Sequence, residues 1–264
     1  MSGVADVFAA CRAEGRGALI GYLPAGYPTV DGSVDLLNAL VEGGCDLLEV
    51  GVPYSDPVMD GPTIQAAADT ALRAGTRLRD VLSVVERVTA AGGRAVVMTY
   101  WNPILRYGVD AWARDLAAAG GFGMITPDLI PDEAEDWLAA SEDHGLDRTF
   151  LVAPSSTEER IASTAAATRG FLYATSTMGV TGARDAVSSA APTIVARCRA
   201  HTDLPIGVGL GVRSGEQAAE IAAYADGVIV GAAFVTAVER GGAAAVRELA
   251  AELAAGVARA HQPA

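Results

Sequence analysis

Two acidic residues, Glu49 and Asp60, have the spacing and surroundings that acid–base chemistry uses. Glu49 lies between Leu48 and Val50 in a short apolar run, which predicts a buried strand carrying one carboxyl group. A buried carboxyl group costs free energy unless it has a partner or a chemical task. Asp60 follows in a polar loop, and two carboxyl groups in unlike surroundings can serve as acid and base. The alternative from spacing alone is a glutamate bonded to a core hydroxyl, beside solvated loop acids.

Several glycines in the second half of the chain have the character of a phosphate site. Gly211 ends a glycine-rich segment that follows one apolar run, and Gly231 and Ala232 follow the next run and can begin a short helix. Backbone amides at a helix N-terminus bind phosphate without a cation, and glycine lets the backbone approach closely. Gly182, in an earlier loop, can add further amides. The alternative is that these glycines only make tight turns.

Aromatic and aliphatic residues between these two groups can form the walls of a flat apolar slot. They are Tyr22, Met98, Tyr100 and Leu210. Each of them could instead fill the protein core. Taken together, the predicted site would hold a flat, nitrogen-bearing apolar group at one end and a phosphate at the other.

The elements that must position these residues form a repeating pattern of strand and helix. Eight continuously apolar runs are each followed by a helical segment, and such runs are typical of a parallel sheet covered on both faces. The runs cover residues 18–22, 46–50, 94–98, 122–125, 149–152, 171–174, 205–208 and 227–230. Eight units of strand and helix predict an α/β fold, a single TIM (β/α)8 barrel, with an extra N-terminal helix over residues 4–13. An open, doubly wound sheet is the alternative.

No linker or change in composition divides the chain, so we expect one domain over residues 1–264. In a barrel, the functional groups lie at the C-terminal ends of the strands. This rule places Tyr22, Glu49, Tyr100, Asp128 and Tyr173 around one mouth. It also places the glycines after the seventh and eighth strands, where barrels commonly hold phosphate.

Composition excludes several classes of function. The net charge of −13 argues against a nucleic-acid or anionic-membrane surface, and no apolar run approaches the length of a membrane span. The N-terminus lacks the pattern of a signal peptide, so we expect a cytoplasmic protein. The chain contains no lysine, which excludes a Schiff-base lysine and a Walker-type loop. Its scattered cysteines and histidines predict no disulfide framework, no metal and no cofactor.

The chain resembles the tryptophan synthase alpha chain family from end to end. The strongest resemblance lies in residues 48–57 and 60–65, which include both acids. Further blocks match in order: residues 22–28, 100–103, 127–129, 179–182 and 209–212. The chain departs from the family at Ala232, where serine is common, and at Ile130, where proline is common.

The resemblance implies a TIM barrel that cleaves indole-3-glycerol phosphate to indole and glyceraldehyde 3-phosphate. It implies Glu49 and Asp60 as the catalytic pair and Tyr173 as a supporting residue. It also implies a phosphate site at Gly182, Gly211, Gly231 and Ala232. A β chain would take the indole directly, in an αβ or α2β2 assembly, and residues 175–185 would close over the substrate.

The chemistry of the residues agrees with this resemblance. A protonated indole can accept the electron pair of the breaking bond, so the cleavage needs neither lysine nor metal. Glu49 suits the roles of acid at C3 and base for the side-chain hydroxyl, and Asp60 suits the stabilisation of charge at the ring nitrogen. The alternatives are a free-standing lyase of the same chemistry, another phosphate-handling barrel such as an isomerase, and a barrel that only binds and activates a partner.

Overall fold

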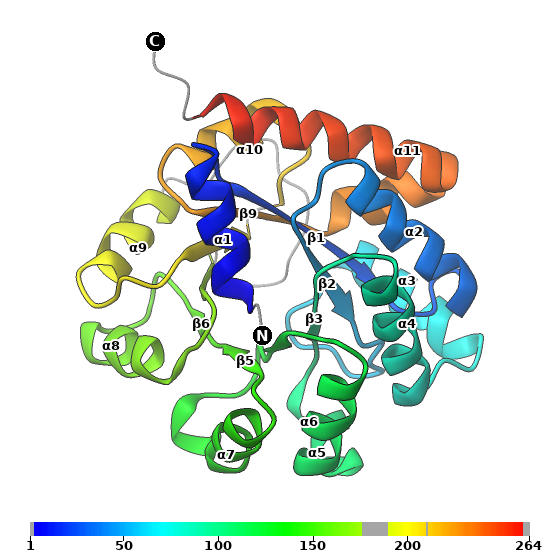
Figure 1. The fold of residues 1–264 in the computed structure, drawn as a ribbon, viewed down its shortest axis with the longest axis horizontal. Coiled ribbons are helices and arrows are strands. Elements are labelled where there is room, and N and C mark those ends of the chain that lie inside the picture. The colour runs from blue at the N-terminus through cyan, green and yellow to red at the C-terminus, as the bar shows by residue number, and fades with distance from the viewer. Residues whose placement is uncertain (1–2, 176–189, 210, 261–264) are drawn as a thin grey trace.

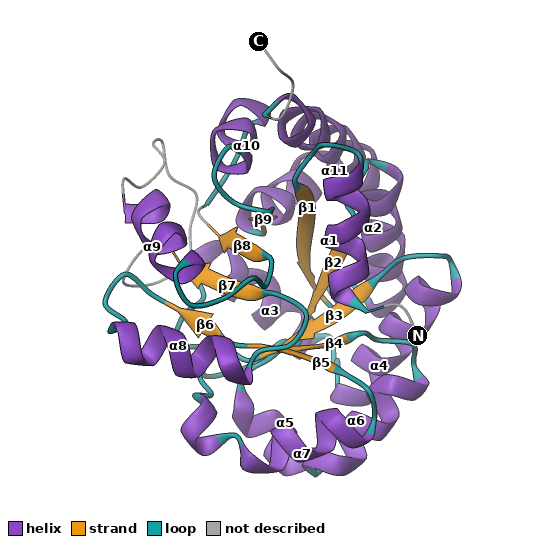
Figure 2. Ribbon diagram, turned by 60° about the vertical axis from the view of Figure 1, so that its left-hand side comes forward, coloured by secondary structure: helices purple, strands orange, loops and turns teal. Residues whose placement is uncertain are grey.

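The computed structural model describes residues 3–175, 190–209 and 211–260. Its strands form one parallel sheet in the order β5-β4-β3-β2-β1-β9-β8-β7-β6, with helices around the outside (Figure 2). The strands are β1 (Ala18–Pro24), β2 (Leu47–Gly51), β3 (Ala95–Met98), β4 (Gly123–Ile125), β5 (Asp147–Thr149), β6 (Leu151–Val152), β7 (Leu172–Thr175), β8 (Ile206–Gly209) and β9 (Gly227–Val230).

The two ends of this strand order meet in one segment of chain. Strands β5 and β6 are separated only by Phe150, and they pair with β4 and β7 respectively. The amide of Tyr173 donates to the carbonyl of Phe150 at 3.2 Å, which carries the pairing across the break. The two short strands therefore correspond to the single run predicted over residues 149–152. The sheet closes into the predicted barrel, and the open-sheet alternative is wrong.

The helices follow the strands as predicted, with more pieces than the sequence indicated. They are α1 (Val4–Ala13), α2 (Val30–Glu42), α3 (Pro62–Arg73), α4 (Leu78–Ala90), α5 (Trp101–Tyr107), α6 (Val109–Ala118), the 3-10 turn η1 (Pro131–Glu133), α7 (Glu135–Asp143), α8 (Glu158–Ala167), α9 (Ala190–Arg199), α10 (Gly215–Ala222) and α11 (Ala232–Arg259). The short helix α5 was not expected. Helix α11 joins the predicted short helix to the final helix through a kink at Gly241 and Gly242.

The extra N-terminal helix, α1, closes one end of the barrel (Figure 1). Its Val4, Val7 and Phe8 pack against the side chains that point into the barrel, such as Phe171. The Phe8 and Phe171 rings lie 5.4 Å apart between centroids. Asp147 accepts a hydrogen bond from the amide of Val4 at 2.7 Å, which fixes the start of the helix. Because this end is filled, the mouth at the C-terminal ends of the strands is where a ligand can enter.

Most of the remaining apolar side chains pack between the sheet and the surrounding helices. Leu48 and Val50 belong to this layer, whereas Leu47 belongs to the interior of the barrel. Successive strand residues thus alternate between the two cores, as the pleat of a strand requires. Within the three described stretches, no helix combines the length and the apolar character needed to cross a bilayer.

Candidate functional site

Glu49 lies inside the barrel near its open mouth. It follows the inward-facing Leu47 by two residues on β2, so it points to the same side, and only 1% of it is exposed. Burial raises the pKa of this carboxyl group to about 8. Its Oε1 atom has no hydrogen-bond partner among the described residues. Glu49 is therefore protonated at neutral pH and can donate its proton to a bound molecule.

Two buried tyrosines flank this carboxyl group. Tyr22 pairs in register with Glu49 on the adjacent strand β1, and Tyr173 lies on β7 across the barrel. Burial raises the pKa of both tyrosines well above its usual range, and the nearby Glu49 raises it further. Glycines make room for both rings, because a side-chain carbon at Gly51 would clash with the Tyr22 hydroxyl and one at Gly209 with the Tyr173 hydroxyl. The structure thus brings Tyr22, Glu49 and Tyr173 together, as the strand-end rule predicted.

Asp60 is held at the same mouth by contacts to the loop after β3. Burial raises the pKa of its carboxyl group, and a hydrogen bond from the Tyr100 hydroxyl opposes that rise. The same hydroxyl accepts the amide N–H of Met59 at 3.0 Å. The side chain of Gln65 donates to the carbonyl of Asp60 at 2.7 Å. Asp60 is also close enough to Tyr22 that its charge raises the pKa of that tyrosine. Tyr22 therefore lies near both acids.

Two further residues, Tyr54 and Asn102, hold the Asp60 loop, and sequence reasoning had assigned no role to Asn102. The rings of Tyr54 and Tyr100 lie 5.3 Å apart between centroids. The side-chain amide of Asn102 donates to the Tyr54 hydroxyl at 3.1 Å. Both residues stand inside the family-like blocks quoted above, but only the unexpected helix α5 brings Asn102 back towards Tyr54. The aromatic residues that line the mouth therefore also help to hold Asp60 in place.

The glycine-rich side of the mouth presents backbone rather than side chains. Gly211 has a φ of +68°, a conformation that glycine adopts without strain. Gly231 is the N-cap of α11, and its carbonyl accepts the amide of Phe234 at 2.9 Å. The preceding amides of the first turn have no acceptor within the helix and are suited to an anion. Gly182 and Leu210 lie outside the described residues, as does almost all of the predicted closing loop over residues 175–185.

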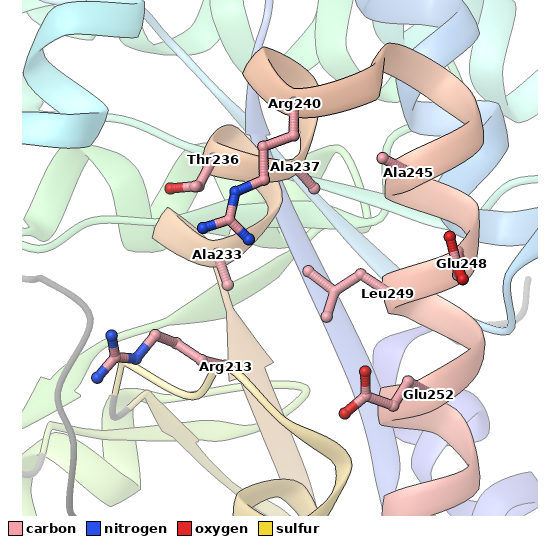
Figure 3. Close-up of a pocket in the computed structure, with 9 residues that line it drawn as sticks. All are labelled: Arg213, Ala233, Thr236, Ala237, Arg240, Ala245, Glu248, Leu249 and Glu252. Atoms are coloured by element: carbon pink, nitrogen blue, oxygen red, sulfur yellow. The ribbon is translucent and has the colours of Figure 1, made fainter.

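A separate hollow of about 400 Å³ lies beside the first turn of α11 (Figure 3). Arg213 and Arg240 line it on one side, and Glu248 and Glu252 line it from the second half of α11. The Glu252 carboxylate also accepts the amide of Gly215 at 2.8 Å, which joins α11 to the start of α10. Positive and negative side chains balance each other here, so this hollow differs in character from the backbone cradle at Gly211 and Gly231.

The remaining candidates for redox or metal chemistry are scattered. Cys11, Cys45 and Cys198 are free and buried, and burial is the main reason that the pKa of the Cys11 thiol rises to about 12. In the parts of the chain that the structure describes, no cluster of His, Cys, Asp or Glu side chains could hold a metal ion. The mouth instead combines a protonated buried acid, a second carboxyl group and backbone amides. This arrangement can bind a phosphorylated aromatic molecule and exchange protons with it.

Comparison with known proteins places this geometry in one family. The sequence profile of the family described as "Tryptophan synthase alpha chain" matches residues 8–262. The alpha chain of Nocardia farcinica is 70% identical over 256 residues, which cover 97% of this chain and 96% of the relative. A structure of Mycobacterium tuberculosis tryptophan synthase superposes with a TM-score of 0.93 at 68% identity, covering 96% of this chain and 97% of that one. The alpha subunit from Legionella pneumophila strain Paris, at 31% identity, superposes with a TM-score of 0.87, covering 98% and 99% of the two chains. The chain therefore belongs to the tryptophan synthase alpha chain family.

Proposed function

We propose that the mouth of this barrel cleaves indole-3-glycerol phosphate to indole and glyceraldehyde 3-phosphate, the alpha reaction of tryptophan synthase. The observation that carries the assignment of the catalytic groups is the burial of Glu49, which raises its pKa to about 8. A carboxyl group that is protonated at neutral pH is the acid that the reaction requires. The second acid, Asp60, stands at the same mouth with an opposing hydrogen bond from Tyr100.

The reaction follows from the positions of these groups. Glu49 gives its proton to C3 of the indole ring, and the ring nitrogen acquires positive charge. The carboxylate left on Glu49 takes the proton of the side-chain hydroxyl as the carbon–carbon bond breaks. The electron pair of that bond returns to the ring, which leaves neutral indole and an aldehyde. Asp60 stabilises the charge that develops at the ring N–H.

The other side of the mouth supplies binding. Gly211 and the first turn of α11 after Gly231 present backbone amides, and Gly182 is assigned to the same role from the family resemblance. Tyr22, Tyr100 and Leu210 are assigned to the walls around the indole ring. Tyr173 is assigned as the supporting residue beside Glu49, because Glu49 raises the pKa of that tyrosine. Ala232 offers its amide but no hydroxyl.

The proposed partner is a tryptophan synthase β chain, in an αβ or α2β2 assembly. The large apolar side chains that stand exposed on the described surface are Val58, Leu105 and Ile130, with exposed fractions of 68%, 51% and 42%. They lie in the segments that follow three neighbouring strands, β2, β3 and β4. Val58 is two residues from Asp60, so a partner seated on this face would also contact the loop that carries the acid. Indole would then pass to the β chain without release.

We further propose that the protein works in the cytoplasm, because its phosphorylated substrate is charged and does not cross membranes.

We also propose that residues 1–264 form one domain, because α1 and α11 at opposite ends of the chain pack on the same barrel. The free-standing lyase is set aside, since the relatives are named as alpha chains.

The test is indole release from indole-3-glycerol phosphate by the purified chain, followed by titration with a matching β chain. We expect slow release by the chain alone and stimulation of at least about tenfold at saturation, which corresponds to about 1.4 kcal/mol of activation free energy. If the β chain also strengthens substrate binding to the chain, bound substrate should strengthen the complex in turn, because the coupling of two binding events is reciprocal. No indole in either condition would overturn the proposed reaction. Full activity alone, with no complex by sedimentation, would overturn the proposed partnership.

A further inference from the structure

We propose that Asp128 is a positioning residue that holds Asp60 in its working place through Tyr100. This inference rests on the role proposed for Asp60 and adds a residue that touches neither acid. Asp128 follows β4, whereas Tyr100 follows β3 and Asp60 follows β2. A line of contacts therefore crosses three neighbouring loops at the rim of the mouth.

The first contact in this line is an unusual helix cap. Helix α5 begins at Trp101, and its N-cap residue, Tyr100, provides no side-chain cap of its own. Asp128 supplies the cap from the next loop: its two carboxylate oxygens accept the amide N–H of Trp101 at 2.9 and 3.2 Å. A charged acceptor at the first turn of a helix also interacts favourably with the helix dipole. Asp128 thus fixes the backbone where β3 gives way to α5.

The second contact links the position of the α5 backbone to the position of the Tyr100 side chain. Tyr100 has extended dihedral angles, φ −68° and ψ 157°, directly before the capped amide. Its ring reaches back to the loop after β2, where the hydroxyl accepts the Met59 amide at 3.0 Å and donates to the Asp60 carboxylate. A shift of the start of α5 would move this hydroxyl and with it the restraint on Asp60. Misplacement of a catalytic group by about 1 Å can cost a large factor in rate.

The residue at position 100 supports a role for Asp128 beyond the capping of α5. A serine, threonine or aspartate at position 100 itself could cap α5 locally, as Thr29 caps α2 and Thr157 caps α8. Position 100 instead carries the tyrosine that reaches Asp60, and the cap comes from a separate loop. Asp128 is also exposed and stands two residues from Ile130, on the face proposed to meet the β chain. It is therefore placed where a bound partner can tighten the restraint on Asp60.

The first test compares Asp128→Ala with Asp128→Asn in the complex with the β chain. The alanine variant loses the acceptor, and we expect kcat for indole formation to fall about tenfold with KM changed less than about twofold. The asparagine variant keeps a side-chain oxygen that can cap the helix, so it should recover most of the rate. Thr157→Ala is the matched control, because it removes a helix cap far from the acids, where Thr157 accepts the amide of Arg160 at 3.2 Å. If Asp128→Ala behaves like Thr157→Ala, the positioning role is wrong.

The second test asks whether Asp128 acts through Tyr100. Tyr100→Phe removes the hydroxyl that contacts Met59 and Asp60, and we expect it to lower kcat about tenfold. If both residues serve one restraint, the double variant should lose about tenfold and not about one hundredfold. Multiplication of the two losses, or a Tyr100→Phe variant with the wild-type rate, would overturn the inference. Asp60→Asn separates the two proposals, because wild-type activity in that variant would remove the role of Asp60 itself.

Discussion

The two sides of the barrel mouth do different work with different parts of the chain. On the side of β1, β2 and β3, the working groups are side chains: burial raises the pKa of both Glu49 and Asp60, and a hydrogen bond from Tyr100 opposes that rise at Asp60. On the side of β8 and β9, the working groups are backbone amides, exposed by Gly211 and by the helix start after Gly231. A substitution on the first side should therefore remove chemistry, whereas one on the second side should remove binding.

The largest effect is expected from Glu49→Gln, which removes the transferable proton but keeps the volume. We expect kcat to fall by about 10³-fold or more, because one group serves as both acid and base. Binding of glycerol phosphate should remain within about twofold of wild type, since the phosphate side is untouched. The control is Glu142→Gln, which removes an exposed carboxylate paired with Arg148 and Arg169. A near-normal kcat in Glu49→Gln would contradict the division between the two sides.

Asp60→Asn should have the next largest effect. A neutral amide cannot offset the positive charge at the ring nitrogen, so we expect kcat to fall by about 10²-fold. An N-methylated indole substrate provides an independent check, because it lacks the ring N–H that Asp60 would contact. Wild-type enzyme should cleave it slowly, and Asp60→Asn should show little preference between the two substrates. Equal rates for both substrates in the wild type would rule out a direct contact.

Gly211→Val should act on the other side of the mouth and raise KM. A side chain at a φ of +68° is strained, and it would block the approach of phosphate to the backbone. We expect KM for the phosphorylated substrate to rise by about tenfold or more, with inhibition by glycerol phosphate weakened equally. Gly92→Val is the matched control, because Gly92 also has a positive φ, +95°, and no atoms crowd it. A fall in kcat alone would place the phosphate elsewhere.

The smallest effect is expected from Ala232→Ser, which adds a hydroxyl at the first residue of α11. If the first turn holds the phosphate, a serine there can donate one more hydrogen bond, and KM should fall by about two- to fivefold. The value of kcat should stay within about twofold, since position 232 is on the binding side. An unchanged KM would show that this residue does not reach the phosphate.

The sequence predicted the barrel and the placement of its mouth because both depend on strand ends. Tyr22, Glu49 and Tyr173 stand at the ends of apolar runs, and the pleat of each strand directs their side chains into the interior of the barrel. The extra helix over residues 4–13 was predicted too, but its position across one end of the barrel was not. The division of residues 149–152 into two strands was not, because it depends on pairing with partners on both sides.

The contacts that hold Asp60 in place could not be predicted from the sequence, for a different reason. The sequence contains no periodic signal that joins Asp128 to Trp101 or Tyr54 to Asn102, since each pair connects an irregular loop to the first turn of α5. Helix α5 is seven residues long, too short for a clear apolar stripe. Such contacts are fixed only when the barrel brings neighbouring strand ends to one rim. The predicted roles of Gly182 and Leu210 stay predictions, because both lie outside the described residues.

Titration of the Glu49 carboxyl group would show whether the barrel keeps this group protonated at neutral pH. The chain would be labelled with 13C at the glutamate carboxyl carbons, and the Glu49 signal identified by its loss in Glu49→Gln. Because burial raises the pKa, the acid form should persist through neutral pH and ionise at a midpoint of about 8, and kcat/KM should fall over the same range. A midpoint near the ordinary value of 4.5 would rule out Glu49 as the acid, because it would then have no proton to give at neutral pH.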